Sequence, residues 1–155
     1  MSILEVGKSH WAKGIDPVAD AFAGTVRSDV YNMENFHHAE FLIYKGVGTT
    51  GTSTITVNRC DDVVPTTRTT IPFKSQNITS GDTHGALTNR AAAGFDTTAG
   101  SSQLYRIYVD AADVAPDGFV ELNMVEVVDS PVVGAISFIG HGGRYQQDVQ
   151  PTAIV

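Results

Sequence analysis

The chain has 155 residues, of which 42% are hydrophobic and 17% charged, and its formal net charge is -7 at pH 7. A chain of this length can bury one core, and its composition excludes wholesale disorder. The negative charge argues against nucleic-acid binding and against anionic membranes, and no apolar run approaches the roughly 20 residues that span a bilayer.

The first 30 residues show no sustained alternation, and we predict that residues 1–30 form an N-terminal arm. Asp16 and Pro17 are suited to start a short helix that ends near Phe22. Trp11 and Phe22 would be the apolar anchors of the arm on a neighbouring molecule, or would pack on the chain's own core; the sequence leaves both open. The opening residues lack a basic leader and a long apolar stretch, so cytoplasmic synthesis is expected.

A strand is predicted over residues 36–45, FHHAEFLIYK. Its odd-numbered residues share one face and its even-numbered residues the other, and both faces are largely apolar after residue 40. We therefore expect a central strand. Residues 54–57 alternate in the same way after a glycine-rich turn at 48–51, which predicts that the two strands pair as a hairpin.

The middle of the chain, residues 61–103, is the least regular part. A candidate strand covers residues 69–74, and Pro65 and Pro72 confine any strand here to an edge or a bulge. Residues 91–94, AAAG, fit either a helical turn or a loop.

Strand patterns return in the last third of the chain. Residues 104–110 alternate strictly, and residues 119–128 place Val120, Leu122 and Met124 on one face until the alternation slips near Val125, where we expect a bulge or the strand's end. Residues 132–140 form a nearly continuous apolar run that should lie deep in the fold. The tail beyond Gly142 is polar and expected to be loosely held.

Together these patterns predict about six to eight strands at short spacing, and no helix strong enough for βαβ units. The expected fold class is all-β: an antiparallel β-sandwich of jelly-roll type over residues 31–155, preceded by the arm. Such sandwiches leave edge strands whose unpaired backbone groups are templates for association.

The strongest candidate for a metal site is His37-His38-Ala39-Glu40. On a strand His38 and Glu40 share a face while His37 points away, so this segment offers at most two ligands to one ion. His84 and His141 would have to complete the set. We therefore predict no metal site, and expect hydrogen-bonded histidines at a sheet surface.

Other reactive groups are weakly supported. Cys60 is the single cysteine, and the acidic residues that follow it would raise its pKa, which predicts an inert thiol. The run 140–144, GHGGR, lacks the Lys-Ser/Thr ending of a phosphate loop and is predicted to be a flexible exit from the last strand. No nucleophile elbow is present. We expect no catalytic residue, no cofactor and no enzymatic activity.

Two blocks carry a family resemblance, residues 31–57 and 104–145. The first opens with YNMENFHHAEFL, and the second contains a strand ending in VDAAD and the segment SPVVGA before a terminal Arg-Tyr. In these segments the chain resembles small proteins of tailed bacteriophages that are similar to the jelly-roll cement protein of a Bordetella phage.

The resemblance implies a structural virion protein that decorates the outer capsid surface, bridges major capsid subunits and assembles with itself. A dimer is favoured over a trimer by this resemblance and by the commonness of twofold symmetry. Aromatic and arginine residues dominate interface hot spots, so the predicted contact residues are Trp11, Phe22, Arg144 and Tyr145. The alternatives are a head-to-tail connector or tail subunit, a carbohydrate-binding β-sandwich module, and a metal-dependent cupin-like enzyme.

Overall fold

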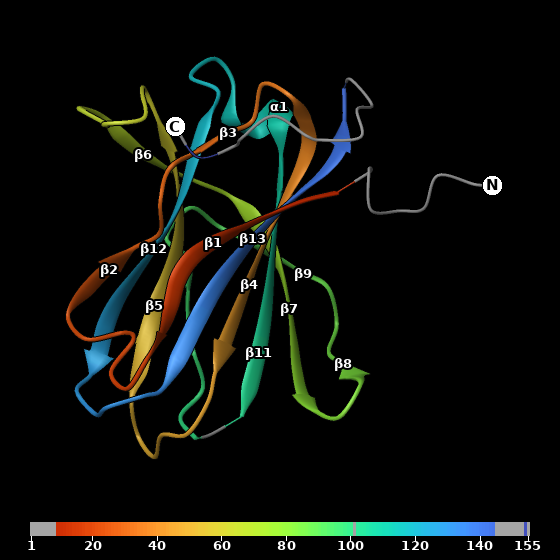
Figure 1. Ribbon diagram of the computed structural model, residues 1–155. Helices are drawn as coiled ribbons and strands as arrows, with labels where there is room; N and C mark the ends of the chain where they lie inside the picture. The colour runs from red at the N-terminus through yellow and green to blue at the C-terminus, as the bar shows by residue number, and fades with distance from the viewer. Residues whose placement is uncertain (1–8, 101, 145–153, 155) are drawn as a thin grey trace.

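The computed structural model describes residues 9–100, 102–144 and 154, and in this part of the chain two antiparallel sheets pack face to face. Figure 1 shows the strands running along one common long axis, with the short helix α1 (Ala111–Val114) at one end. No helix in the described ranges is long and apolar enough to cross a membrane.

The larger sheet, called sheet A, has seven strands. Its order in space is β1 (Ser9–Val18), β13 (Gly134–Gly143), β4 (Phe36–Lys45), β11 (Gln103–Asp110), β7 (Phe73–Ser80) and β8 (Thr83–His84), with β9 (Thr88–Arg90) beside β7. In Figure 1, β1 in red runs beside β13 in blue, as their antiparallel register requires. β1 therefore forms one edge of sheet A.

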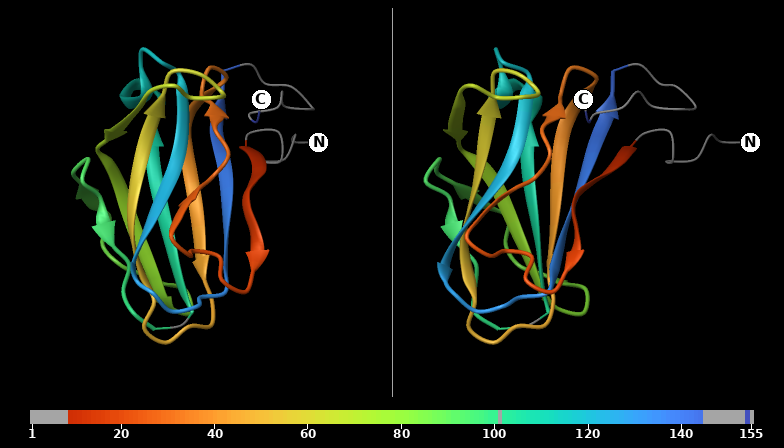
Figure 2. Two further views of the ribbon diagram at one scale, coloured as in Figure 1. Left: turned by 90° about the vertical axis from the view of Figure 1, so that its left-hand side faces the viewer. Right: turned by 60° about the vertical axis from the view of Figure 1, so that its left-hand side comes forward.

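The smaller sheet, called sheet B, has six strands. Its order is β10 (Phe95–Asp96), β5 (Thr52–Cys60), β12 (Phe119–Val128) and β2 (Thr25–Arg27), with β3 (Tyr31–Asn32) beside β12 and β6 (Arg68–Ile71) beside β5. Figure 2 shows the two sheets as two layers, one carrying β5 and β12 and the other carrying β4, β11 and β13.

The core fills the space between these layers with the inward-facing residues of both sheets. An aromatic cluster lies at its centre: the ring of Tyr31 stacks on Phe138 at 3.9 Å between centroids and meets Phe41 edge-on at 5.6 Å. The Tyr31 hydroxyl donates to the backbone oxygen of Lys13 at 2.6 Å, which ties β3 of sheet B to β1 of sheet A. Burial, with Asp29 as a smaller cause, raises the pKa of Tyr31 far above its usual value, so the phenol stays a donor.

The predicted fold class is confirmed, because the described chain is an all-β sandwich of two antiparallel sheets. β4 is central, between β13 and β11, as its two apolar faces predicted. Near Val125, where the apolar alternation was expected to slip, the pairing of β12 with β5 shifts register between Glu126 and Val128. The more specific jelly-roll assignment stays a prediction.

The described part of the predicted arm belongs to the sandwich. Residues 9–18 pair with β13 from Ser9 opposite His141 to Val18 opposite Gly134, and β2 pairs with β12. The helix expected to start at Asp16 does not form, because a lone two-turn helix is marginal while the strand gains partners from β13. Residues 19–22 are a turn instead.

The predicted hairpin between residues 36–45 and 54–57 is wrong, because β4 lies in sheet A and β5 in sheet B. A glycine-rich turn can connect two strands of one sheet or two strands of different sheets. The alternation of apolar and polar residues is the same in both cases, so it does not show which connection forms. Close backbone packing explains one of these glycines: a Cβ on Gly51 would lie 2.4 Å from the backbone oxygen of Ser130.

The expected strand over residues 69–74 is divided between the two sheets. β6 ends at Ile71 in sheet B and β7 begins at Phe73 in sheet A, with Pro72 at the crossing. Proline has no backbone N–H to donate to a ladder, so the crossing falls where a continuous strand would lose a hydrogen bond.

Candidate functional site

The four predicted contact residues have different environments. Trp11 is 64% exposed on β1, whereas Phe22 is 4% exposed and packs in the core, so Phe22 does not serve as an anchor for a neighbour. Arg144 is exposed just after β13, and its backbone N–H donates to the backbone oxygen of Asn35 at 2.9 Å. Tyr145 lies outside the described residues.

Trp11 belongs to the face of sheet A that points away from sheet B, called the outer face. Directly opposite residues of antiparallel strands project on the same side. The register therefore places five side chains in one row across the sheet, called the Glu40 row: Trp11, Ile139, Glu40, Tyr108 and Lys74.

A buried carboxylate holds the centre of the row. Glu40 is only 3% exposed although it points outward, because Arg106 and His141 cover it. Arg106 donates from Nε to Oε1 at 2.5 Å and from a terminal nitrogen to Oε2 at 3.1 Å, and His141 Nε2 lies 3.2 Å from Oε2. The hydrogen bond to Glu40 raises the pKa of Arg106, so the guanidinium stays charged.

Of the residues considered for a metal site, Glu40 and His141 are in contact, whereas His38 and His84 have other partners. Both Glu40 oxygens are engaged as described above, while His38 Nδ1 pairs with Asp110 Oδ2 at 3.3 Å and His84 Nδ1 contacts Gln76 Oε1 at 3.2 Å. Within residues 9–100 and 102–144, no three His, Cys, Asp or Glu side chains are grouped so as to hold a metal ion. The expected flexible exit at residues 140–144 is instead the end of β13, which continues to Gly143.

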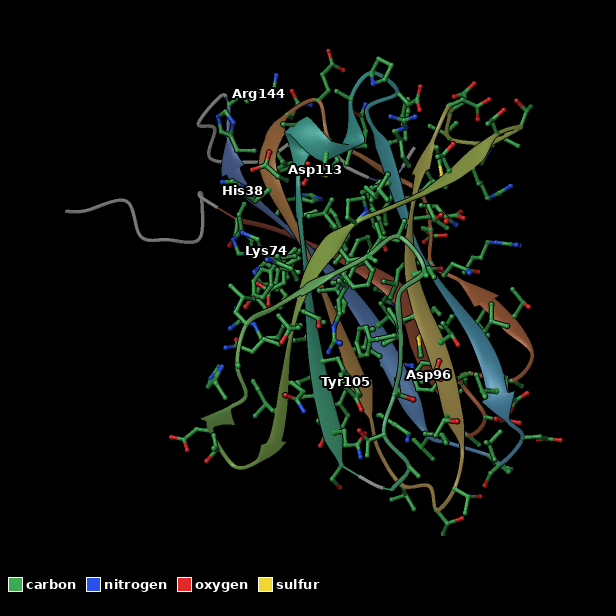
Figure 3. The ribbon with its side chains drawn as sticks, turned by 180° about the vertical axis from the view of Figure 1, so that it is seen from behind. His38, Lys74, Asp96, Tyr105, Asp113 and Arg144 are labelled. Carbon is green, nitrogen blue, oxygen red and sulfur yellow. The ribbon has the colours of Figure 1, made fainter. Side chains whose placement is uncertain are left out.

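A groove of about 630 Å³ opens beside Tyr108, at the end of the Glu40 row. The end of β11 and α1 supply one side of it, including Asp110 and Asp113, and β7 and β9 supply the other, including Lys74 and Arg90. In Figure 3, His38, Lys74 and Asp113 lie together in the same part of the molecule, around this groove.

The groove carries charges of both signs. Arg90 is held in place, because its Nε donates to Ser75 Oγ at 2.8 Å and its guanidinium lies 4.2 Å from the ring centroid of Phe95. Lys74 and Asp113 are exposed, and neither forms an ion pair with another described residue. Both are therefore available to a ligand.

Sheet B carries a second buried carboxylate on its outer surface. Glu121 has a 1% exposed side chain, and its Oε1 accepts from Asn58 at 2.8 Å and from Arg68 Nε at 2.9 Å, with Arg27 Nε at 3.6 Å. Nearby, Cys60 is buried; burial first and Glu121 second raise its pKa to about 12. The thiol is thus poorly suited to nucleophilic chemistry. Burial raises its pKa more than the acidic residues that follow it in the sequence.

Sequence reasoning missed Arg106, Lys74 and Asp113. One signal for Arg106 was present: a single arginine inside the strictly alternating LYRIYVD implies a partner for its charge. The partner is Glu40, 66 residues away, and only the register of β11 on β4 reveals it.

Comparisons with known proteins found low similarity to a prophage protein and to viral proteins among solved structures. No protein-family model and no curated protein matches the sequence. Among solved structures, the SPBc2 prophage-derived protein YomS is similar with 11% identity and a TM-score of 0.45, over 85% of this chain and 91% of that one. A chain from the infectious bursal disease virus Gx strain is similar with 13% identity and a TM-score of 0.41, over 90% of this chain and 34% of that one. This chain thus spans about a third of that viral chain.

Proposed function

We propose that the protein is a structural component of a bacteriophage particle that binds the outer surface of the capsid and bridges neighbouring major capsid subunits. It acts by surface complementarity and requires no catalysis, cofactor or metal. The proposed partners are the capsid shell and further copies of the chain itself.

The observation that carries this proposal is the edge of sheet A at Trp11. β1 has ten residues and pairs with β13 alone among the described strands, whereas the other described strands with a single partner, β2, β3, β6, β8, β9 and β10, have two to four. Native proteins keep edge strands short or covered, because an edge offers unpaired N–H and C=O groups to another chain. Here the long edge also presents the indole of Trp11, which is 64% exposed. An apolar anchor beside an open edge suits a protein partner.

Two further features support the proposal. The net charge of -7 would keep free subunits soluble and would repel them from packaged nucleic acid. The two sequence blocks that resemble phage cement proteins correspond to β3 to β5 and β11 to β13, the strands that build the centre of both sheets.

Bridging strengthens weak contacts. When an oligomer engages several capsid subunits at once, each further contact is intramolecular, which raises avidity by roughly 10²–10⁴-fold. A contact at Trp11 and a second near Arg144 would lie along the same β1 and β13 edge, since Trp11 pairs with Ile139, five residues before Arg144. That separation is roughly 16 Å along the strand.

The test is saturable binding of the purified protein to capsid shells that lack it, compared between the natural chain and Trp11→Ala. The substitution should weaken binding by at least about tenfold, because truncated hot-spot tryptophans commonly cost more than about 2 kcal/mol. The matched control is Leu87→Ala, which removes a comparably exposed apolar side chain (56%) near the opposite edge of sheet A.

Leu87→Ala should bind shells like the natural chain, and far-UV circular dichroism should show both variants folded. Labelled protein should cover the shell in many copies. Failure of the natural chain to bind shells, or labelling confined to one vertex, would contradict the decoration role. Equal binding by both variants would contradict the role of Trp11.

A further inference from the structure

We propose that the groove beside Tyr108 binds a neutral sugar residue of a glycan. The inference goes beyond the capsid role and rests on different residues. Its basis is the combination of a groove of small-molecule size, an aromatic side chain and polar groups of both charges.

The size of the groove suits one or two sugar rings. Its volume of about 630 Å³ lies within the range of roughly 300–1,000 Å³ that is typical of ligand sites. Pro72, Tyr108 and Ala112 supply apolar surface, and polar side chains from α1, β7 and β9 surround it. This pattern of an apolar lining with a few placed polar groups is that of a ligand pocket.

The charges select the ligand class. Lys74 and Arg90 would attract an anion, but Asp110 and Asp113 line the same groove and would repel it, and the reverse holds for a cation. A hydroxyl group donates to a carboxylate and accepts from an ammonium or guanidinium group, so a neutral polyol satisfies both sets at once. Asn89 adds an amide that also donates and accepts.

Tyr108 is held in a fixed position for stacking. The guanidinium of Arg106 lies 5.0 Å from its ring centroid, and Arg106 is itself fixed by its two hydrogen bonds to Glu40. Burial, then Glu40, raises the pKa of Tyr108, which keeps its hydroxyl protonated as a donor. A preformed aromatic group lowers the entropy cost of binding.

The experiment is a screen of the full chain against an array of neutral and acidic oligosaccharides, followed by calorimetric titration of the strongest binder. Lys74→Ala and Asp113→Ala each remove one exposed polar group from the groove without disturbing the core. Asp82→Ala is the matched control, because Asp82 is also exposed but lies in the turn between β7 and β8, outside the groove.

A neutral oligosaccharide should bind saturably, and each groove variant should weaken it by about tenfold, the effect of one lost hydrogen bond to a charged group. Asp82→Ala should bind like the natural chain. The proposal is overturned if no neutral glycan binds, if the groove variants bind with unchanged affinity, or if only acidic glycans bind and inorganic phosphate displaces them. Each of these results leaves capsid binding through Trp11 unaffected.

Discussion

Removing the guanidinium from the Glu40 network should destabilise the protein strongly. In Arg106→Met the side chain keeps an apolar stem on the outer face but loses the guanidinium and both hydrogen bonds to Glu40, one at 2.5 Å and one at 3.1 Å. Glu40 is 3% exposed and would keep His141 as its remaining polar partner in the network. Its carboxylate would then be buried with two of these three contacts unmade.

The magnitude follows from the burial of the two partners. Breaking a fully buried ion pair costs about 3–5 kcal/mol, and a hydrogen bond to a charged group is worth about 1.5–3 kcal/mol. The Arg106 side chain is 29% exposed, so water replaces part of the loss on that side. We expect the free energy of unfolding to fall by about 3 kcal/mol, equivalent to a drop in Tm of about 6–12 °C for a chain of this size.

Urea unfolding followed by circular dichroism measures this loss as a shift of the midpoint at constant slope. Lys74→Met is the matched control, because Lys74 lies in the same row without an ion pair to any described residue, and should change stability by less than about 0.5 kcal/mol. The double variant Glu40→Leu with Arg106→Met removes both partners and should recover most of the loss. Arg106→Met within about 0.5 kcal/mol of the natural chain would refute the account of this network.

Two further predictions concern the core and the thiol. Gly134→Ala should lower the free energy of unfolding by about 2 kcal/mol, because the added Cβ would lie 2.5 Å from two ring atoms of Phe22 and 2.8 Å from the Tyr44 backbone oxygen. Thermal unfolding measures this loss. An unchanged Tm would argue that Phe22 does not pack against Gly134. Cys60, with its pKa raised to about 12 by burial, should not react with a thiol-specific disulfide reagent at pH 8 until urea unfolds the chain. Rapid labelling of the native protein would contradict this burial.

The sequence predicted individual strands well because alternation reflects burial directly. Outward and inward residues alternate along β11 and along β12 as far as Met124, and the inward residues Ile107, Val109, Val120 and Leu122 are buried as expected. Pairing was harder to predict, since β4 and β5 are adjacent in sequence but lie in different sheets. Which strands pair depends on how the whole core closes, and this information is not local.

The same limit applies to the candidate sites. His38 and Glu40 were recognised from one strand, but their partners Asp110, Arg106 and His141 come from β11 and β13. The groove likewise combines β7, β9, β11 and α1, and both β7 and β9 lie in the region whose sequence pattern was least regular. Short strands such as β9, with three residues, are too brief to produce a recognisable period.

When the protein binds a capsid shell, the edge of sheet A at Trp11 should become covered. Trp11 is the single tryptophan of the chain, so its fluorescence reports on that edge without labelling. Acrylamide should quench the free protein efficiently, because the indole is 64% exposed. On shells saturated with protein, the account predicts a blue-shifted emission that is largely protected from quenching. Equal quenching of free and shell-bound protein would contradict it.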